Sequence, residues 1–393
     1  MIIPMSSPVL SEDDIQAVKE VLETRYLSIG PKVEAFEEGI ASYTGTKFGI
    51  TVNSGTSALH LAVIAAGIRE NDLVITTPFS FIASANCILF EKAIPVFVDI
   101  DPISYNIDPE QVAQATQDLM AGGKAAERWL PRKIKGKLDH NSKLKAILPV
   151  DAFGQPADYD PIQKTASDQG LKIIEDSCEA LGSEYKGKKA GTFGDVGAFA
   201  FYPNKQITTG EGGILVTDNE DWAMLFLSLR NQGRDIFNAW LNHTRLGYNY
   251  RMDEMSAALG LSQLKRIEEL LSRRESVAGW YNQYLADVEE IRLPIILPET
   301  TKMSWFVYVI QSNSREIRDR LMLELEVNGI PSRPYFSSIH LQPFYTQRFG
   351  YKRGDFPRTE LAGDCCLALP FSGAMTEKEV QFVCNIIKNI LAS

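Results

Sequence analysis

The chain has 393 residues, enough for two domains of ordinary size with a substantial hydrophobic core. Its 40 basic and 50 acidic side chains give a net charge of −10, so nucleic acid and anionic membrane surfaces are poor partners. Hydrophobic residues make up 45% of the chain, which excludes a largely disordered protein.

The five cysteines match neither a disulfide framework nor a zinc pattern, and they favour a reducing compartment. They are Cys87, Cys178, Cys365, Cys366 and Cys384. The first residues lack the basic and apolar regions of a secretory signal, and no apolar run has the length of a membrane span. We expect a cytoplasmic protein with no metal site.

Apolar strands alternate with helices through the first half of the chain. Ser11 and Asp14 have the spacing of a capping box at the start of a helix over 11–24. Further helices are predicted at 56–66, 83–91 and 158–169, and strands at 73–76, 95–99, 145–150, 171–176, 196–201 and 213–216. This order predicts an α/β fold with a mainly parallel sheet that is covered on both faces.

The region 120–145 interrupts this alternation with a basic, mostly polar stretch that includes Arg128 and Arg132. Its only aromatic residue is Trp129. A nucleic-acid contact is one interpretation, but such a run is more typical of a solvated surface insertion.

The character of the sequence changes after a helical pattern that runs without interruption over 253–285. A strand is predicted at 305–310, a helix at 315–328 and a last helix after Thr376. We therefore predict a large domain over 1–265 and a smaller α+β domain over 266–393.

Lys205 follows the strand at 196–201 and precedes a glycine-rich turn. A desolvated lysine amine can attack a carbonyl, which is what a Schiff base with pyridoxal phosphate requires. A surface lysine in a turn explains this segment equally well. Asp176 ends another apolar strand, where it could keep a pyridine nitrogen protonated or simply cap the next helix.

Two further segments could complete a cofactor site. The turn at 53–57 leads into a helix whose first amides, with the hydroxyls of Thr56 and Ser57, could bind a phosphate; a plain helix cap is the alternative. After the strand at 73–76, Phe79 or Phe81 could stack on a flat ring, or either could belong to the core.

The sequence resembles the DegT/DnrJ/EryC1/StrS sugar aminotransferase family over nearly its whole length. Matching segments lie at 30–37, 54–59, 175–182, 201–205, 210–213 and 247–252. The resemblance implies a three-layer fold of the aspartate aminotransferase kind (fold type I), a smaller C-terminal α+β domain, and pyridoxal 5'-phosphate as the cofactor.

The resemblance also implies roles for single residues. Lys205 would bond to the cofactor and move the proton, Asp176 would pair with the pyridine nitrogen, and Phe81 would stack on the ring. Gly55 and Thr56 would hold the phosphate, with Ser57 beside them.

Asn249 resembles the residue that reaches the phosphate from a second subunit, which implies a homodimer with shared active sites. Two positions depart from the family pattern: Ala200 stands where serine is frequent, and Glu179 stands where glutamine or histidine is frequent. The departures put one phosphate contact and the contact near the ring hydroxyl in question. Lys205 argues against the family's dehydratases, in which histidine replaces the lysine.

The segments around 329–345 and 369–371 are similar to those of members like GDP-perosamine synthase. His340 in this region could face a sugar or nucleotide, although a lone histidine is more often structural. The resemblance implies transfer of the amino group of L-glutamate to a 4-keto-6-deoxy nucleotide-sugar, for surface polysaccharide or secondary-metabolite synthesis. Alternatives are a 3-keto-sugar or keto-cyclitol substrate, or a non-catalytic cofactor-binding regulator.

Overall fold

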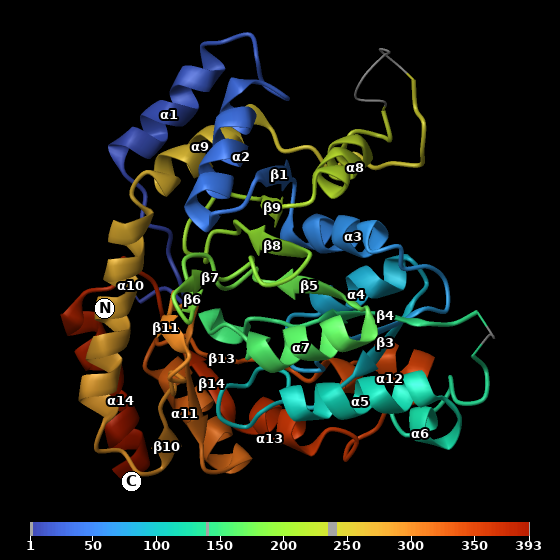
Figure 1. Cartoon of the computed structure of the whole chain (residues 1–393). Helices are drawn as coiled ribbons and strands as arrows, with labels where there is room; N and C mark the ends of the chain where they lie inside the picture. The colour runs from blue at the N-terminus through green and yellow to red at the C-terminus, as the bar shows by residue number, and fades with distance from the viewer. Residues whose placement is uncertain (1–2, 139–140, 235–241, 393) are drawn as a thin grey trace.

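The computed structural model describes residues 3–138, 141–234 and 242–392 (Figure 1). The largest sheet among them has seven strands. In spatial order its strands are β1 (Phe48–Val52), β9 (Gly213–Thr217), β8 (Val196–Ala200), β5 (Lys172–Asp176), β4 (Leu144–Leu148), β2 (Leu73–Thr76) and β3 (Ile94–Phe97). β9 runs antiparallel to both neighbours, and the other adjacent pairs are parallel. The predicted mainly parallel sheet is confirmed.

Helices cover both faces of this sheet, as the apolar strands predict. One face packs against α3 (Gly55–Ala65), α4 (Ala83–Phe90) and α8 (Glu220–Arg230). The opposite face packs against α2 (Pro31–Thr44), α5 (Pro109–Ala121), α7 (Tyr159–Gln169) and α9 (Glu254–Leu264). The carboxyl ends of the parallel strands are left for the connecting loops, where ligands bind in such folds.

The C-terminal part contains a second, antiparallel sheet. Its strands in spatial order are β10 (Ile291–Arg292), β12 (Tyr308–Ser312), β14 (Cys366–Leu369) and β13 (Arg333–Pro334). It shares a core with α10 (Ile267–Leu285), α11 (Arg315–Val327) and α14 (Glu377–Ala392). The proposed division into two domains at residue 265 stays a prediction.

The remaining elements complete the described chain. They are α1 (Glu12–Leu22), α6 (Gly123–Glu127), α12 (Pro343–Phe349), α13 (Pro357–Cys365), the 3-10 turns η1 (Ala152–Gly154) and η2 (Ile339–Leu341), and a small sheet of β11 (Thr300–Lys302), β6 (Glu184–Tyr185) and β7 (Lys188–Lys189). Within the described ranges, no helix combines the length and apolarity that crossing a membrane requires.

The prediction of one long helix over 253–285 is wrong, because the chain breaks into α9 and α10 at Lys265 and Arg266. The guanidinium of Arg266 donates to the carbonyl of Val9 and to the carboxylate of Asp14, which caps α1. The break therefore rests on a contact with the first helix of the chain. It lets α9 pack against α1 and α2 while α10 packs against α14.

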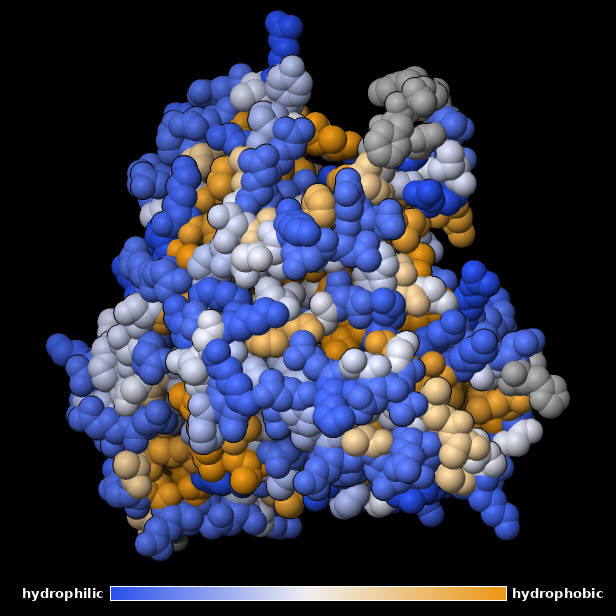
Figure 2. Space-filling model, viewed as in Figure 1, coloured by the Kyte–Doolittle hydropathy of each residue, from blue (hydrophilic) through white to orange (hydrophobic). Residues whose placement is uncertain are grey.

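The basic insertion forms a surface segment that folds back on the C-terminal part. The amide of Lys133 donates to the carbonyl of Phe349 at 3.1 Å, and Arg132 pairs with Asp355. Leu130 is buried beneath it, and residues 139–140 lie outside the described residues. Figure 2 shows that the face carrying α5 and α7 is largely hydrophilic.

Candidate active site

A cavity of about 410 Å³ lies at the carboxyl ends of β5 and β8, beside the first turn of α3. Six of the eight predicted site residues line it: Gly55, Thr56, Phe81, Asp176, Glu179 and Lys205. The cavity is thus built from turns that follow several strands of the sheet, as the parallel topology predicts.

The first turn of α3 presents free backbone donors to the cavity. Ser54 caps the helix, since its Oγ accepts from the amide of Ser57 at 3.1 Å. A side chain at Gly55 would place its Cβ 2.7 Å from the Cβ of Ala200, so only glycine allows this close approach to β8. Among the described residues, the amides of Gly55 and Thr56 have no hydrogen-bond partner. Such a helix start binds an anion through these amides and the helix dipole.

Asp176 lies at the end of β5 and is buried. Its Oδ2 accepts from the hydroxyl of Ser84 at 2.5 Å, and its Oδ1 accepts from the amide of Cys178 at 3.3 Å. No cation pairs with this carboxylate among the described residues. It is therefore available to a positively charged group of a ligand.

Lys205 enters the cavity from the turn after β8, and its side chain is only 13% exposed. Its Nζ lies 3.7 Å from Oε1 of Glu179 and 3.8 Å from the ring centroid of Phe306. The amine therefore lies against an acidic side chain and the face of an aromatic ring. The sheltered position answers the question left open by the sequence: this lysine is not a surface residue.

Glu179 is buried beside Lys205. Its Oε2 accepts from the amide of Phe153 at 2.9 Å. Burial raises the pKa of Glu179 to about 7, although the Lys205 ammonium pulls it in the opposite direction. The side chain therefore changes charge near neutral pH, which glutamine at this position could not do.

This pKa makes stability depend on pH in a specific way. Between the ordinary value of 4.5 and about 7, the folded protein keeps the Glu179 proton while the unfolded chain has lost it. The free energy of unfolding of the cofactor-free wild type therefore falls as pH rises through this window. Relative to wild type, Glu179→Gln should gain on the order of 2–3 kcal/mol across it.

Urea unfolding at several pH values between 5 and 8 measures this difference. Glu38→Gln, which changes an exposed carboxylate on α2, is the control and should show no such trend. A difference between Glu179→Gln and wild type that stays constant with pH would contradict the argument.

The two phenylalanines of the loop after β2 differ: one packs in the core and the other lines the cavity. Phe79 is fully buried in the core, whereas Phe81 is 62% exposed and lines the cavity mouth. Phe81 is the ring that a bound cofactor could contact.

Two predicted residues do not line the cavity of their own chain. The hydroxyl of Ser57 donates to Oδ1 of Asn53 at 2.7 Å, inside the turn rather than toward the cavity. Asn249 forms a bridge with Asn231, and its carbonyl accepts from Nδ2 of Asn53 at 3.5 Å. Their roles as cofactor contacts stay predictions.

Several lining residues escaped the sequence reasoning, chiefly Tyr202, Phe306 and Tyr335. Residues 305–307 do not belong to the predicted strand, which begins only at Tyr308. Trp305 has a φ of 51°, a turn that delivers Phe306 to Lys205. The apolar alternation hides this turn, so the sequence carried no signal for it.

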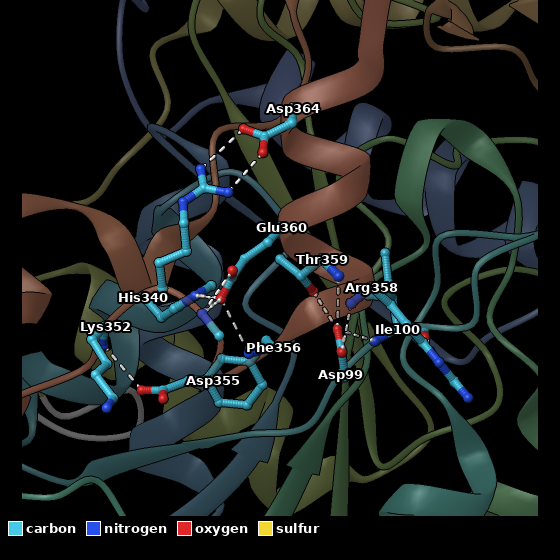
Figure 3. A network of polar contacts seen from close by, with 12 residues as sticks. Asp99, Ile100, His340, Lys352, Asp355, Phe356, Arg358, Thr359, Glu360 and Asp364 are labelled. Atoms are coloured by element: carbon cyan, nitrogen blue, oxygen red, sulfur yellow. Dashed lines mark hydrogen bonds and ion pairs between the residues drawn. The ribbon is translucent and has the colours of Figure 1, made fainter. Parts of the chain in front are cut away.

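His340 has a structural role (Figure 3). It is fully buried, and its Nε2 lies 3.0 Å from Oε1 of Glu360 in α13. Burial lowers the pKa of His340, which the Glu360 carboxylate opposes. It does not line the cavity that holds Lys205, so a contact with the sugar is not supported.

The described residues contain no group of three or more histidine, cysteine or acidic side chains that could hold a metal ion. They do fit pyridoxal phosphate: free helix amides suit its phosphate, an unpaired carboxylate suits its ring nitrogen, and a sheltered amine suits its aldehyde. The site and sheet together define a pyridoxal-phosphate enzyme with the architecture of aspartate aminotransferase.

Known proteins support this assignment. The model of the DegT/DnrJ/EryC1/StrS aminotransferase family matches residues 8–388. GDP-perosamine synthase of Caulobacter vibrioides is 36% identical over 392 residues, covering 99% of this chain and 98% of that protein. Spore coat polysaccharide biosynthesis protein SpsC of Bacillus subtilis is 34% identical over 402 residues, covering 99% and 97%.

The PLP-form structure of Spr1654 from Streptococcus pneumoniae is 25% identical and has a TM-score of 0.88, with 100% of this chain and 99% of that chain covered. The chain belongs to the DegT/DnrJ/EryC1/StrS aminotransferase family. It is an aminotransferase, and its family depends on pyridoxal phosphate.

Proposed function

We propose that this enzyme transfers the amino group of L-glutamate to a 4-keto-6-deoxy nucleotide-sugar. The observation that carries the proposal is the sheltered amine of Lys205, which shares one cavity with Asp176 and the free amides of α3. The similarity to a GDP-perosamine synthase over nearly the whole chain supports a nucleotide-sugar acceptor. The similarity to SpsC supports a role in polysaccharide synthesis.

Pyridoxal phosphate, when bound, supplies an aldehyde that condenses with amines and a ring that accepts electrons from the reacting carbon. The Gly55 and Thr56 amides would hold its phosphate, Asp176 would keep a proton on its ring nitrogen, and Phe81 would cover the ring. The Lys205 Nζ would take up and return the proton at the reacting carbon. Glu179, whose Oε1 lies 3.7 Å from that amine and whose pKa is about 7, would take up or release a proton beside it.

Product analysis tests the choice of substrate. The cofactor-loaded enzyme is incubated with L-glutamate and a 4-keto-6-deoxy nucleotide-sugar, and the sugar amine and 2-oxoglutarate are measured. We expect both products in equal amounts. Products from a 3-keto sugar or a keto-cyclitol alone would replace the substrate assignment, and no amine with any acceptor would favour a non-catalytic regulator.

We also propose a homodimer whose two subunits share each active site. Two observations support it: Asn249 stays outside the cavity of its own chain, and the aromatic residues Phe81 and Tyr202 at the cavity mouth are exposed. A second subunit would cover these rings and bring its Asn249 toward the phosphate.

Mixing Lys205→Ala with Asn249→Ala, each of which we expect to lose most of its activity, tests the shared site. In a dimer of Lys205→Ala with Asn249→Ala, one site receives both intact residues if they come from different subunits. Random exchange of subunits should therefore restore about a quarter of the wild-type activity. No recovery, despite dimers containing both variants, would show that Asn249 does not act across subunits.

A further inference from the structure

A buried arginine lies behind the turn that carries Lys205. Arg274 belongs to α10 and is only 4% exposed. Its Nη1 donates to the carbonyls of Trp305 and Phe306, both at 3.1 Å. Its Nη2 donates to the carbonyls of Asn204 and Lys205, at 3.0 and 2.5 Å. One planar guanidinium thus joins two stretches of backbone that lie about a hundred residues apart in the sequence.

The charge of Arg274 has no carboxylate partner among the described residues. Burial lowers the pKa of Arg274 to about 10, so the side chain is still protonated at neutral pH. A buried cation without a counter-ion is unfavourable unless its donors are satisfied, and a neutral side chain could fill the space at lower cost. What the guanidinium provides instead is a fixed geometry, because its donors point in set directions.

That geometry is centred on Lys205. The guanidinium binds the backbone of Lys205 and the backbone of Phe306, and the Phe306 ring lies 3.8 Å from the Lys205 Nζ. Gln206 adds a second tie, since its Nε2 donates to the carbonyl of Glu179 and to the hydroxyl of Ser304. Arg274 and Gln206 therefore fix the backbone segments that carry the Lys205 amine, the Phe306 ring and the Glu179 side chain.

We propose that Arg274 is a positioning residue: by joining the Lys205 turn to the 305–306 segment, it holds the Lys205 amine where it can react with the aldehyde of the cofactor. The proposal rests on the proposed role of Lys205. It predicts that loss of Arg274 slows bond formation at Lys205 and leaves the phosphate and ring contacts intact, because those come from α3, β5 and the loop after β2.

Two probes separate these effects in Arg274→Met and Arg274→Lys. Pyridoxamine phosphate has no aldehyde, so its affinity reports the phosphate and ring contacts alone. The rate at which pyridoxal phosphate becomes attached to Lys205 in a borohydride-reducible bond, followed by mass spectrometry of the Lys205 peptide, reports the position of the amine. Arg273→Met is the matched control, since the neighbouring Arg273 is 49% exposed and pairs with Glu269.

We expect Arg274→Met to bind pyridoxamine phosphate within about twofold of wild type and to form the bond at least about tenfold more slowly, since small displacements of reacting groups slow reactions strongly. The rate of bond formation in Arg274→Lys should lie between the rates of wild type and Arg274→Met, because an ammonium reaches fewer of the four carbonyls. Arg273→Met should match wild type. If Arg274→Met does not fold, as judged by thermal melting, Arg274→Lys carries the same comparison.

An equal loss of affinity and rate would overturn the proposal, because it would mean that Arg274 only stabilises the fold. An unchanged rate would overturn it as well. If the reducible bond still forms in Lys205→Ala, the assignment of Lys205 fails, which is a different result from a failure of Arg274.

Discussion

Lys205→Ala is expected to abolish amino transfer, with kcat reduced by roughly 10⁴-fold or more, because it removes both the amine that bonds to the cofactor and the group that moves the proton. The side chain lies in the cavity, 3.7 Å from Glu179 and 3.8 Å from the ring centroid of Phe306, and no other lysine of the described part of the chain lines that cavity. Steady-state kinetics with L-glutamate and the keto-sugar measure the loss, and a thermal melt shows whether the variant is folded.

Lys188→Ala is the control for this experiment, since Lys188 is exposed and does not line the cavity. It should keep wild-type turnover. A folded Lys205→Ala protein with turnover close to wild type would refute the mechanism proposed above.

Asp176→Asn is expected to lower kcat by roughly 10²-fold or more, because a neutral amide cannot hold a proton on the ring nitrogen as a carboxylate does. The size of the side chain is unchanged, and the amide oxygen can still accept from the hydroxyl of Ser84, so the fold should survive. The loss should appear in kcat more than in the affinity for the cofactor phosphate, which is bound by α3.

Asp168→Asn is a suitable control, since Asp168 lies at the surface of α7 in an exposed pair with Lys164. Kinetics and pyridoxamine phosphate affinity are measured for both variants. Equal activity of Asp176→Asn and wild type would contradict a role for this carboxylate at the ring nitrogen.

Much of the fold follows from local sequence patterns. The strand predicted at 73–76 is β2 residue for residue, and the helix at 315–328 differs from α11 by one residue, because continuous apolar runs and helical periodicity are local signals. The break between α9 and α10 could not be predicted, since it depends on Arg266 reaching Asp14, which lies 252 positions away. The residues at the break continue the helical pattern of their neighbours, so the local sequence gives no sign that the helix ends there.

The site likewise contains residues that the sequence predicts and residues that it does not. Asp176, Lys205 and the turn at Gly55 could be predicted because each lies at the end of a strand of the mainly parallel sheet or within five residues after one. Phe306 and Arg274 could not, since they come from the C-terminal part and meet Lys205 only through the tertiary fold. Their neighbours in the sequence suggest a strand and an ordinary amphipathic helix.

The visible absorption spectrum of the purified, cofactor-loaded protein, recorded before and after addition of L-glutamate alone, tests the central claim most directly. Transfer of the glutamate amino group should replace the band of the lysine-bound cofactor with the band of its amine form and release 2-oxoglutarate. A lysine-bound band that persists unchanged at saturating L-glutamate would contradict the account.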